Sequence, residues 1–224
     1  MLEHGHSHPV GRLGRELAAC RGLFQLVDNG WTHSADAWIA DMGDRGDFGR
    51  RYVLDPVMLE RARAGRARNA LDVGCGEGRF CRMLRDASAT TTLIDPTPAL
   101  ISVAQSRDPR GHYVRGRAET LPFRDRAFDL VVSYLTLIDI PDIDAAIPEM
   151  ARVLTLGGTL LIANLTSFNT PCADRGWITD DRGQRLHYPI DHYLDDRAML
   201  VEWRGIRIVN YHRQIGRASC RERV

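Results

Sequence analysis

The sequence predicts an α/β protein whose core is a doubly wound, mostly parallel sheet with helices on both faces. Three observations lead to this fold class. Apolar or β-branched runs alternate with segments of helical periodicity through residues 70–165. A glycine-rich turn follows the first run, and an acidic residue ends the second. In such a sheet the crossovers are right-handed, and ligands bind at the carboxyl ends of the strands.

The predicted elements follow one another through the middle of the chain. Strands are expected where apolar or β-branched residues run together, and helices where apolar residues recur every three or four positions. A Gly-Gly turn at 157–158 leads into the last strand. In chain order they are a strand at 70–74, a helix at 79–85, a strand at 90–95, a helix at 100–104, strands at 112–116 and 127–135, a helix at 143–154 and a strand at 157–165.

Two flanking regions differ from the core at 70–165. Residues 1–69 are expected to form a helical region, and its Trp31 and Trp38 suit either a core or a lid. Residues 166–214 are predicted to be an insert on the substrate side. The insert is loop-like to 198 and ends in a hairpin at 199–211, around a two-residue turn that contains Gly205.

The last ten residues, 215–224, have no hydrophobic period. They match the in-frame translation of a common DNA sequencing adapter. We therefore expect this tail to be non-native and the natural chain to continue beyond Gln214. Reading the source gene across the codon for Gln214 tests this expectation.

Composition narrows the function classes. The 224 residues include 30 basic residues, all arginine as in GC-rich bacterial coding, against 29 acidic ones. Without lysine there is no group for Schiff-base chemistry and no P-loop lysine. A formal net charge of +1 gives no sign of nucleic-acid or membrane binding, and the apolar runs are too short to span a bilayer. The five cysteines form no C-x-x-C pair, which favours a reducing cytoplasm; no metal site is expected.

The most informative stretch is the glycine-rich turn at 71–79, LDVGCGEGR. Its glycines allow a tight turn and let a ligand approach the backbone, and the helix that follows favours a polar or anionic group. Asp95 ends the next strand, where a carboxylate can accept both hydroxyls of a ribose. Together these features predict a cofactor that carries a nucleoside. A nicotinamide-binding G-x-G-x-x-G turn would need glycine at position 79, which is Arg79, so an NAD(P)-dependent oxidoreductase is the weaker alternative.

Further motifs follow the turn in a fixed order: AETLPF at 118–123, AFDLVV at 127–132 and EMARVLTLGG at 149–158. With them the chain resembles the class I S-adenosylmethionine-dependent methyltransferases, especially the small-molecule enzymes of ubiquinone and menaquinone biosynthesis. The resemblance covers roughly residues 68–165. It implies a Rossmann-like fold, S-adenosylmethionine as cofactor, and methyl transfer to an oxygen, nitrogen or carbon of a small-molecule acceptor.

The resemblance also implies roles for individual residues. Asp72 would order the glycine loop and reach the cofactor's amino group through water, while Asp95 would bind the ribose. The remaining implied cofactor-binding residues are Gly74, Cys75, Gly76 and Gly78 at the methionine moiety, Pro96, Ala118 and Glu119 at the adenine, and Ser133 and Tyr134 beside the sulfonium and the acceptor.

Two departures from the family pattern stand out. The family often has an acidic residue before the Ala-Glu pair, placed to accept a hydrogen bond from the adenine amino group. Here the residue is Arg117, which has no acceptor. The family fold also closes with a further helix and an antiparallel strand pair. We expect those strands to be missing here, and the hairpin at 199–211 to be an insert.

A general base is required only if the acceptor is a weakly acidic hydroxyl or carbon acid, because the sulfonium already activates the methyl group. The candidate bases are His187, His192, His212 and Asp139. A third function class stays open beside the methyltransferase and the oxidoreductase. In it the chain is a non-catalytic fragment that binds the cofactor weakly or not at all.

Overall fold

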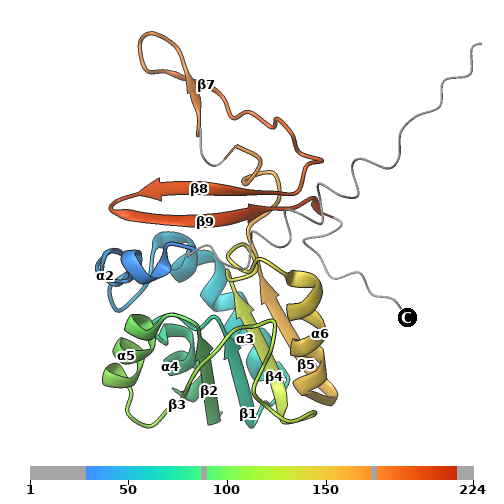
Figure 1. Ribbon diagram of the computed structural model, residues 1–224. Coiled ribbons are helices and arrows are strands. Elements are labelled where there is room, and N and C mark those ends of the chain that lie inside the picture. Colours follow the sequence, from blue (N-terminus) through green and yellow to red (C-terminus); the bar gives the residue numbers. More distant parts are fainter. Residues whose placement is uncertain (1–28, 87–89, 173–175, 216–224) are drawn as a thin grey trace, which may run out of the picture.

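The predicted alternation of strands and helices is present in the structure (Figure 1), a computed structural model that describes residues 29–86, 90–172 and 176–215. Residues 1–28 of the predicted lid region and 216–224 of the predicted tail lie outside the described residues. The elements are α2 (Trp31–Met42), η1 (Arg50–Leu54), α3 (Asp55–Ala64), β1 (Asn69–Val73), α4 (Arg79–Asp86), β2 (Thr90–Asp95), α5 (Pro98–Arg107), β3 (His112–Arg115), β4 (Phe128–Tyr134), α6 (Ile143–Val153), β5 (Leu154–Ala163), β6 (Ile178–Thr179), β7 (Arg185–His187), β8 (Arg197–Trp203) and β9 (Ile206–His212).

The main sheet has five strands in the order β3-β2-β1-β4-β5, and every neighbouring pair is parallel. This confirms the doubly wound α/β fold. From β1 the chain winds outward through β2 to β3, and from β4 it winds the other way to β5. The order therefore reverses between β1 and β4, and loops that leave adjacent strands in opposite directions open a crevice for a ligand at the carboxyl edge.

Helices cover both faces of the sheet. On one face, Met58 of α3 and Leu84 of α4 pack with the strand residues Leu130 and Leu161. On the other, Ile143, Ala146 and Met150 of α6 pack against the opposite side of β1 and β4. Successive strand residues point to opposite faces, so buried β1 and β4 supply apolar side chains to both layers.

Element boundaries agree with the predictions, with two differences. β5 begins at Leu154, immediately after α6, and its pairing with β4 shifts register between Phe128 and Leu130. The region expected to be loop-like contains the short antiparallel pair β6–β7. Strands of two and three residues are too short to show a two-residue hydrophobic period, so the sequence pattern could not reveal them.

The predicted hairpin is formed by β8 and β9, which pair with each other in a separate two-stranded sheet. Its turn residues Arg204 and Gly205 both have positive φ, the geometry that matches the twist of the strands. Figure 1 shows the hairpin beyond the carboxyl ends of the main strands, lying along α2. Within the described residues β5 is an edge of the main sheet.

The hairpin and α2 form one unit through apolar and polar contacts. Val201, Ile206 and Ile208 are buried against Trp31 and Trp38, so both tryptophans belong to a core under the hairpin. The Ser34 hydroxyl of α2 donates to the Arg207 carbonyl and accepts from the Arg207 amide, each at 3.0 Å. These contacts join segments separated by more than 170 residues.

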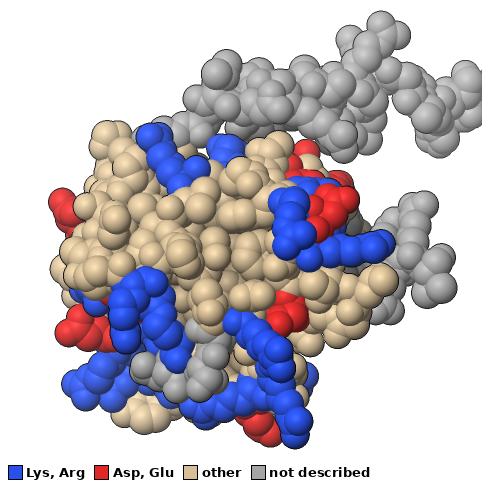
Figure 2. Space-filling model, turned by 90° about the horizontal axis from the view of Figure 1, so that it is seen from below, with Lys and Arg blue, Asp and Glu red and all other residues tan. Residues whose placement is uncertain are grey.

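The opposite face, at the amino ends of the strands, carries mixed charge. Figure 2 shows arginine side chains there beside acidic ones in several places, around a wide area with neither. No helix in the described part of the chain combines the length and apolar character needed to cross a membrane.

Candidate active site

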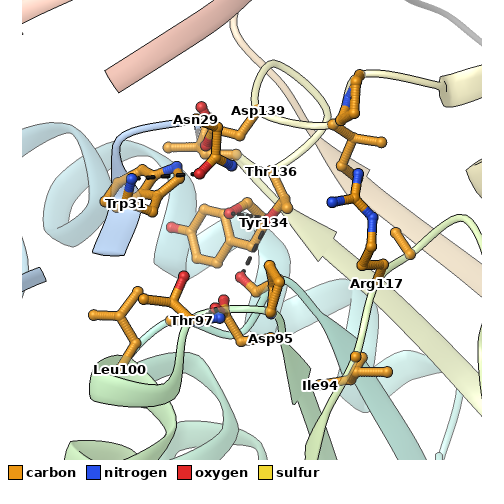
Figure 3. Close-up of a pocket in the computed structure, with 18 of the residues that line it drawn as sticks. Asn29, Trp31, Ile94, Asp95, Thr97, Leu100, Arg117, Tyr134, Thr136 and Asp139 are labelled. Carbon is orange, nitrogen blue, oxygen red and sulfur yellow. Dashed lines mark hydrogen bonds between the residues drawn. The ribbon is translucent and has the colours of Figure 1, made fainter. Parts of the chain in front are cut away.

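A cavity lies at the carboxyl edge of the main sheet, against α2 (Figure 3). Its empty space, with the open mouth included, is about 780 Å³. Most of the predicted cofactor-binding residues line it: Gly74, Gly76, Asp95, Pro96, Ala118, Glu119 and Tyr134. The crevice where the strand order reverses is therefore the place where the sequence motifs meet.

The glycine loop after β1 forms one wall. Gly74 has φ +73°, and a Cβ placed on it would lie 2.0 Å from the Thr136 methyl carbon, so only glycine fits there. Gly76 has φ +55°, and a Cβ on it would find no atom closer than the Trp38 indole nitrogen at 4.0 Å. No side chain therefore covers the Gly76 backbone on the cavity side, and a ligand can approach it closely.

Asp95 is held by the glycine loop and by its own turn. One carboxylate oxygen accepts from the Gly76 amide at 3.0 Å, and the other accepts from the Thr97 amide at 2.8 Å. The side chain is almost fully buried, and burial raises its pKa against the effect of these hydrogen bonds. The Thr97 side chain also hydrogen-bonds to this carboxylate, so three of its four lone pairs are engaged and one stays available for a ligand hydroxyl.

Asp72 lies beneath the loop, behind the cavity wall. Its Oδ2 accepts from the Cys81 thiol at 3.3 Å, whereas Oδ1 is buried with no partner among the described residues. Burial raises the pKa of Asp72 to about 7. An unpaired buried carboxylate oxygen is costly, and it marks a place where a water-linked cation such as an ammonium group would fit.

Three other predicted cofactor residues do not line the cavity. Cys75 lies within the loop, and burial raises the pKa of its thiol well above the usual value, which disfavours a nucleophilic thiolate. Gly78 packs against Ala104 and Leu93, where a Cβ would come within 3.1 Å of both. Ser133 is fully buried, and its hydroxyl has no partner among the described residues.

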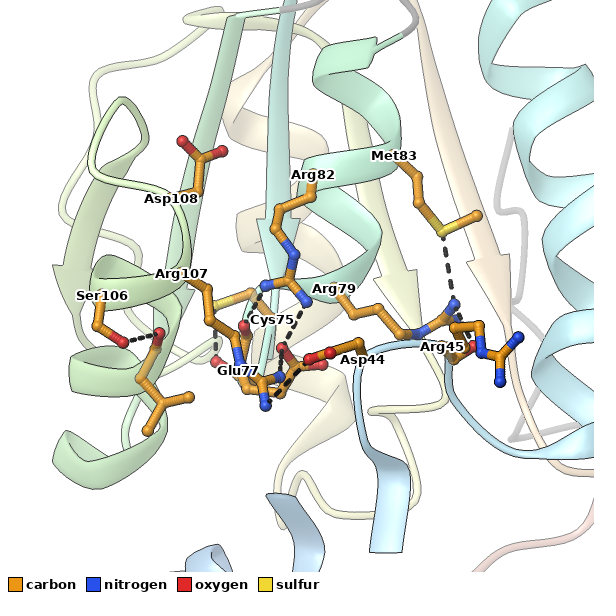
Figure 4. Close-up of polar contacts among 12 residues, drawn as sticks. Asp44, Arg45, Cys75, Glu77, Arg79, Arg82, Met83, Ser106, Arg107 and Asp108 are labelled. Carbon is orange, nitrogen blue, oxygen red and sulfur yellow. Dashed lines mark hydrogen bonds and ion pairs between the residues drawn. The ribbon is translucent and has the colours of Figure 1, made fainter. Parts of the chain in front are cut away.

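Ion pairs fix the loop from outside the cavity (Figure 4). The buried Glu77 carboxylate accepts from Arg82 of α4 at 2.8 Å and from Arg107 of α5 at 2.7 Å. On the other side, Arg79 donates to both oxygens of Asp55 in α3, at 2.8 and 2.7 Å. Arg79 therefore occupies the position where a dinucleotide-binding turn needs glycine, and its side chain holds α3 in place.

The loop after β3 lines the side of the cavity opposite α2. Arg117 and Glu119 both face it and form an ion pair with each other at 2.9 Å. Because a guanidinium only donates, the side-chain acceptor at this place is the Glu119 carboxylate. Ala118 is buried beside it.

Tyr134 ends β4 and lines the cavity with its ring. Its hydroxyl donates a hydrogen bond to Asp55 at 2.7 Å. Burial raises the pKa of Tyr134, and the hydrogen bond to Asp55 raises it further. The ring packs edge-on against Phe80. Tyr134 therefore shapes the cavity, while its hydroxyl is committed to Asp55.

Asp139 is the only one of the four predicted bases that lines the cavity. Asn210 of β9 donates to its Oδ1 at 2.6 Å, and the Trp31 side chain also bonds to it. Desolvation in this place raises the pKa of Asp139 to about 8.

The three histidines lie elsewhere. His187 is exposed on β7, and His192 is exposed with its Nδ1 3.1 Å from Asp195. His212 is fully buried between the Thr170 hydroxyl at 2.7 Å and the Tyr193 carbonyl at 2.9 Å. Both ring nitrogens of His212 thus have partners within the fold. None of the three histidines lines the cavity.

Sequence reasoning did not single out Asn29, Arg50, Thr97 or Thr136, all of which line the cavity. Thr97 and Thr136 each lie two residues beyond a strand end, where the fold brings side chains to the ligand edge. That placement was a usable signal. Arg50 lies over the Trp38 ring, 4.9 Å from its centre, and no local pattern around it marks this position.

Comparison with known proteins gives a consistent result. Residues 71–162 match the methyltransferase domain family. The chain is 32% identical over 152 residues to malonyl-[acyl-carrier protein] O-methyltransferase of Pseudescherichia vulneris, a match that covers 66% of this chain and 59% of that protein. It is 31% identical over 143 residues to the protein of the same name from Serratia marcescens, covering 64% and 54%. The match thus spans little more than half the length of these curated relatives.

Solved structures show the same fold. An S-adenosylmethionine dependent methyltransferase from Mesorhizobium loti superposes with a TM-score of 0.62 at 27% identity, over 72% of this chain and 74% of that one. The PH0226 protein from Pyrococcus horikoshii OT3 gives a TM-score of 0.62 at 19% identity, over 84% and 87%. The second likeness concerns the fold alone.

Proposed function

Because residues 71–162 are a methyltransferase domain of the class I, Rossmann-like fold, we propose that this cavity binds S-adenosylmethionine and that the protein transfers its methyl group to a second molecule in the same cavity. The observation that carries the proposal is the hydrogen bond between Gly76 and Asp95. It brings a backbone without a side chain and a carboxylate with a free lone pair together at the carboxyl edge of the sheet.

The residues present fit the cofactor at three places. The lone pair that Asp95 keeps free suits a hydroxyl of a ribose. The unpaired Oδ1 of Asp72 suits an ammonium group reached through water. Pro96, Ala118 and Glu119 offer an apolar wall with one acceptor, as an adenine ring requires.

When bound, S-adenosylmethionine supplies a methyl group already activated by its sulfonium. The protein then has to align the acceptor with that group and keep water out. Tyr134 and Thr136 at the end of β4 define the floor between the two ligands, while Trp31 and Trp38 of α2 cover it. The acceptor half of the cavity is therefore formed by the region after β4 together with the N-terminal helix.

The two other function classes are an NAD(P)-dependent oxidoreductase and a non-catalytic fragment. The bidentate Arg79–Asp55 pair occupies the position where a dinucleotide-binding turn needs its third glycine, which disfavours the NAD(P)-dependent oxidoreductase. The non-catalytic fragment would have the same fold as the methyltransferase but would bind the cofactor weakly or not at all.

Calorimetric titration with S-adenosylhomocysteine and, separately, with NAD distinguishes the three classes. The proposal expects saturable binding of S-adenosylhomocysteine and none of NAD. Binding of NAD alone would support the oxidoreductase, and binding of neither would support the fragment.

The names of the curated relatives favour a second, more specific function, methylation of a carboxyl oxygen on an acyl chain held by a carrier protein. Arg50 supplies a cation in the cavity that could pair with such a carboxylate. Release of S-adenosylhomocysteine on addition of malonyl-carrier protein, and not of carrier protein alone, is the result expected for this function.

A further inference from the structure

The roof of the cavity holds one carboxyl group that cofactor binding does not use. Asp139 lies in the loop after β4 and remains partly accessible from the cavity, whereas the Asp72 and Asp95 carboxylates are buried. In Figure 3 it lies on the side of Tyr134 away from Asp95, beside Asn29 and Trp31. It therefore faces the half of the cavity that the proposed function assigns to the acceptor.

Two donors from separate elements fix this carboxyl. The Asn210 amide of β9 donates to Oδ1 at 2.6 Å, and the Trp31 side chain of α2 bonds to the group as well. A carboxylate that lines a cavity and is held by hydrogen-bond donors from two other elements has the arrangement of a general base held by a third group.

We propose that Asp139 is the general base of this methyltransferase and that the acceptor is a hydroxyl, which loses its proton as it is methylated, or an ammonium group, which loses a proton before its nitrogen can attack the methyl carbon. This inference rests on the proposed function. For a hydroxyl, the acceptor oxygen bonds to the methyl carbon and the carbon–sulfur bond breaks, with its electron pair going to sulfur. The O–H proton moves to Asp139, so atoms and charge balance.

The surroundings of Asp139 suit that role. Burial raises its pKa to about 8; Asp95 at the end of β2 adds to the increase, and Arg50 of η1 opposes it. Tyr211 of β9 is the other titratable group whose charge interacts with it. A base whose pKa lies near the working pH accepts a proton more strongly than an ordinary carboxylate. A carboxylate acceptor, by contrast, is already ionised and would need no base.

The test uses three probes of similar size: 4-methylphenol, benzylamine and phenylacetate. Release of S-adenosylhomocysteine is followed for each, with the wild type and with Asp139→Asn. We expect turnover of the phenol or the amine, and a loss of about 100-fold or more in kcat in Asp139→Asn. The wild-type rate should rise with pH to a bend near 8 that the variant lacks.

Asp36→Asn is the matched control, because Asp36 is an exposed carboxylate on α2 away from the cavity, and it should keep wild-type kinetics. The dissociation constant for S-adenosylhomocysteine should stay within about twofold in all variants. Methylation of phenylacetate alone, wild-type rates in Asp139→Asn, or no turnover of any probe by protein that binds S-adenosylhomocysteine would each overturn the inference. Failure of the wild type to bind S-adenosylhomocysteine would instead overturn the proposed function.

Discussion

Arg79 and Asp55 form a bidentate ion pair almost fully removed from water, with N–O distances of 2.7 and 2.8 Å. The pair connects the helix that follows the glycine loop with α3, and Tyr134 adds a third hydrogen bond at the same carboxylate. The glycine loop is thus held in place by a contact between residues 24 positions apart.

Replacing Arg79 by leucine leaves the Asp55 carboxylate buried without its cation. Loss of one partner of a buried pair costs about 3–5 kcal/mol, so the urea midpoint should fall strongly. Removing only the hydroxyl in Tyr134→Phe should cost about 1 kcal/mol. Arg204, an exposed arginine paired with the half-buried Asp41, is the control: Arg204→Leu should change the midpoint far less, and equal effects of the two arginine variants would contradict the role of burial.

Asp95→Ala tests the cofactor site directly. The change removes the acceptor proposed for the ribose and the carboxylate that orders the Gly76 and Thr97 amides. Losing hydrogen bonds to a charged acceptor costs about 1.5–3 kcal/mol, so affinity for S-adenosylhomocysteine should fall about 10- to 100-fold by calorimetry. Asp181→Ala, at an exposed site between β6 and β7, should bind as the wild type does. Unchanged binding in Asp95→Ala would exclude Asp95 from the site.

Gly74→Ala and Gly157→Ala separate backbone strain from steric overlap. Both glycines have φ near +75°, so alanine should cost about 1–2 kcal/mol at either position. A Cβ at Gly157 meets nothing within 4 Å, whereas one at Gly74 overlaps Thr136. Gly74→Ala should therefore lower the melting temperature more and weaken S-adenosylhomocysteine binding, while Gly157→Ala leaves binding intact. Equal melting temperatures for the two variants would argue against the overlap.

Asp139 should make stability depend on pH in a defined direction. Its pKa is about 8 in the folded protein and near 3.8 in the unfolded chain, so between these values only the folded state keeps the proton. Stability should then fall as pH rises from about 4 to 8, by up to about 1 kcal/mol per pH unit. Urea unfolding at pH 5 and 7.5 should show a smaller fall in Asp139→Asn than in the wild type or in Asp36→Asn. Parallel curves for all three proteins would show that Asp139 ionises as an ordinary exposed carboxyl.

The sequence predicted the sheet and the cavity-lining residues of the glycine turn and Asp95 because both depend on local patterns. Buried parallel strands appear as apolar runs, and the glycine turn and Asp95 belong to adjacent strand ends whose spacing is fixed by one crossover. The hairpin was predicted for the same reason: its turn and alternating residues are contiguous.

Other residues at and around the cavity were predicted less well because they come together only through packing. Asp55 has no feature in its own neighbourhood that marks Arg79 and Tyr134 as partners. His212 was a reasonable candidate base from its aromatic surroundings, yet the fold buries it with Thr170 and Tyr193. A single sequence contains the residue types but does not show which face of a hairpin turns inward.

The contacts between Ser34 and Arg207 can form only late in synthesis, because Arg207 follows Ser34 by more than 170 residues. α2 leaves the ribosome early, whereas the hairpin that covers its tryptophans follows more than 160 residues later. Through that interval Trp31 and Trp38 lack the hairpin residues that bury them, although the parallel strands β1 to β5 can already assemble. A nascent chain paused before the hairpin should therefore present this face of α2 to chaperones.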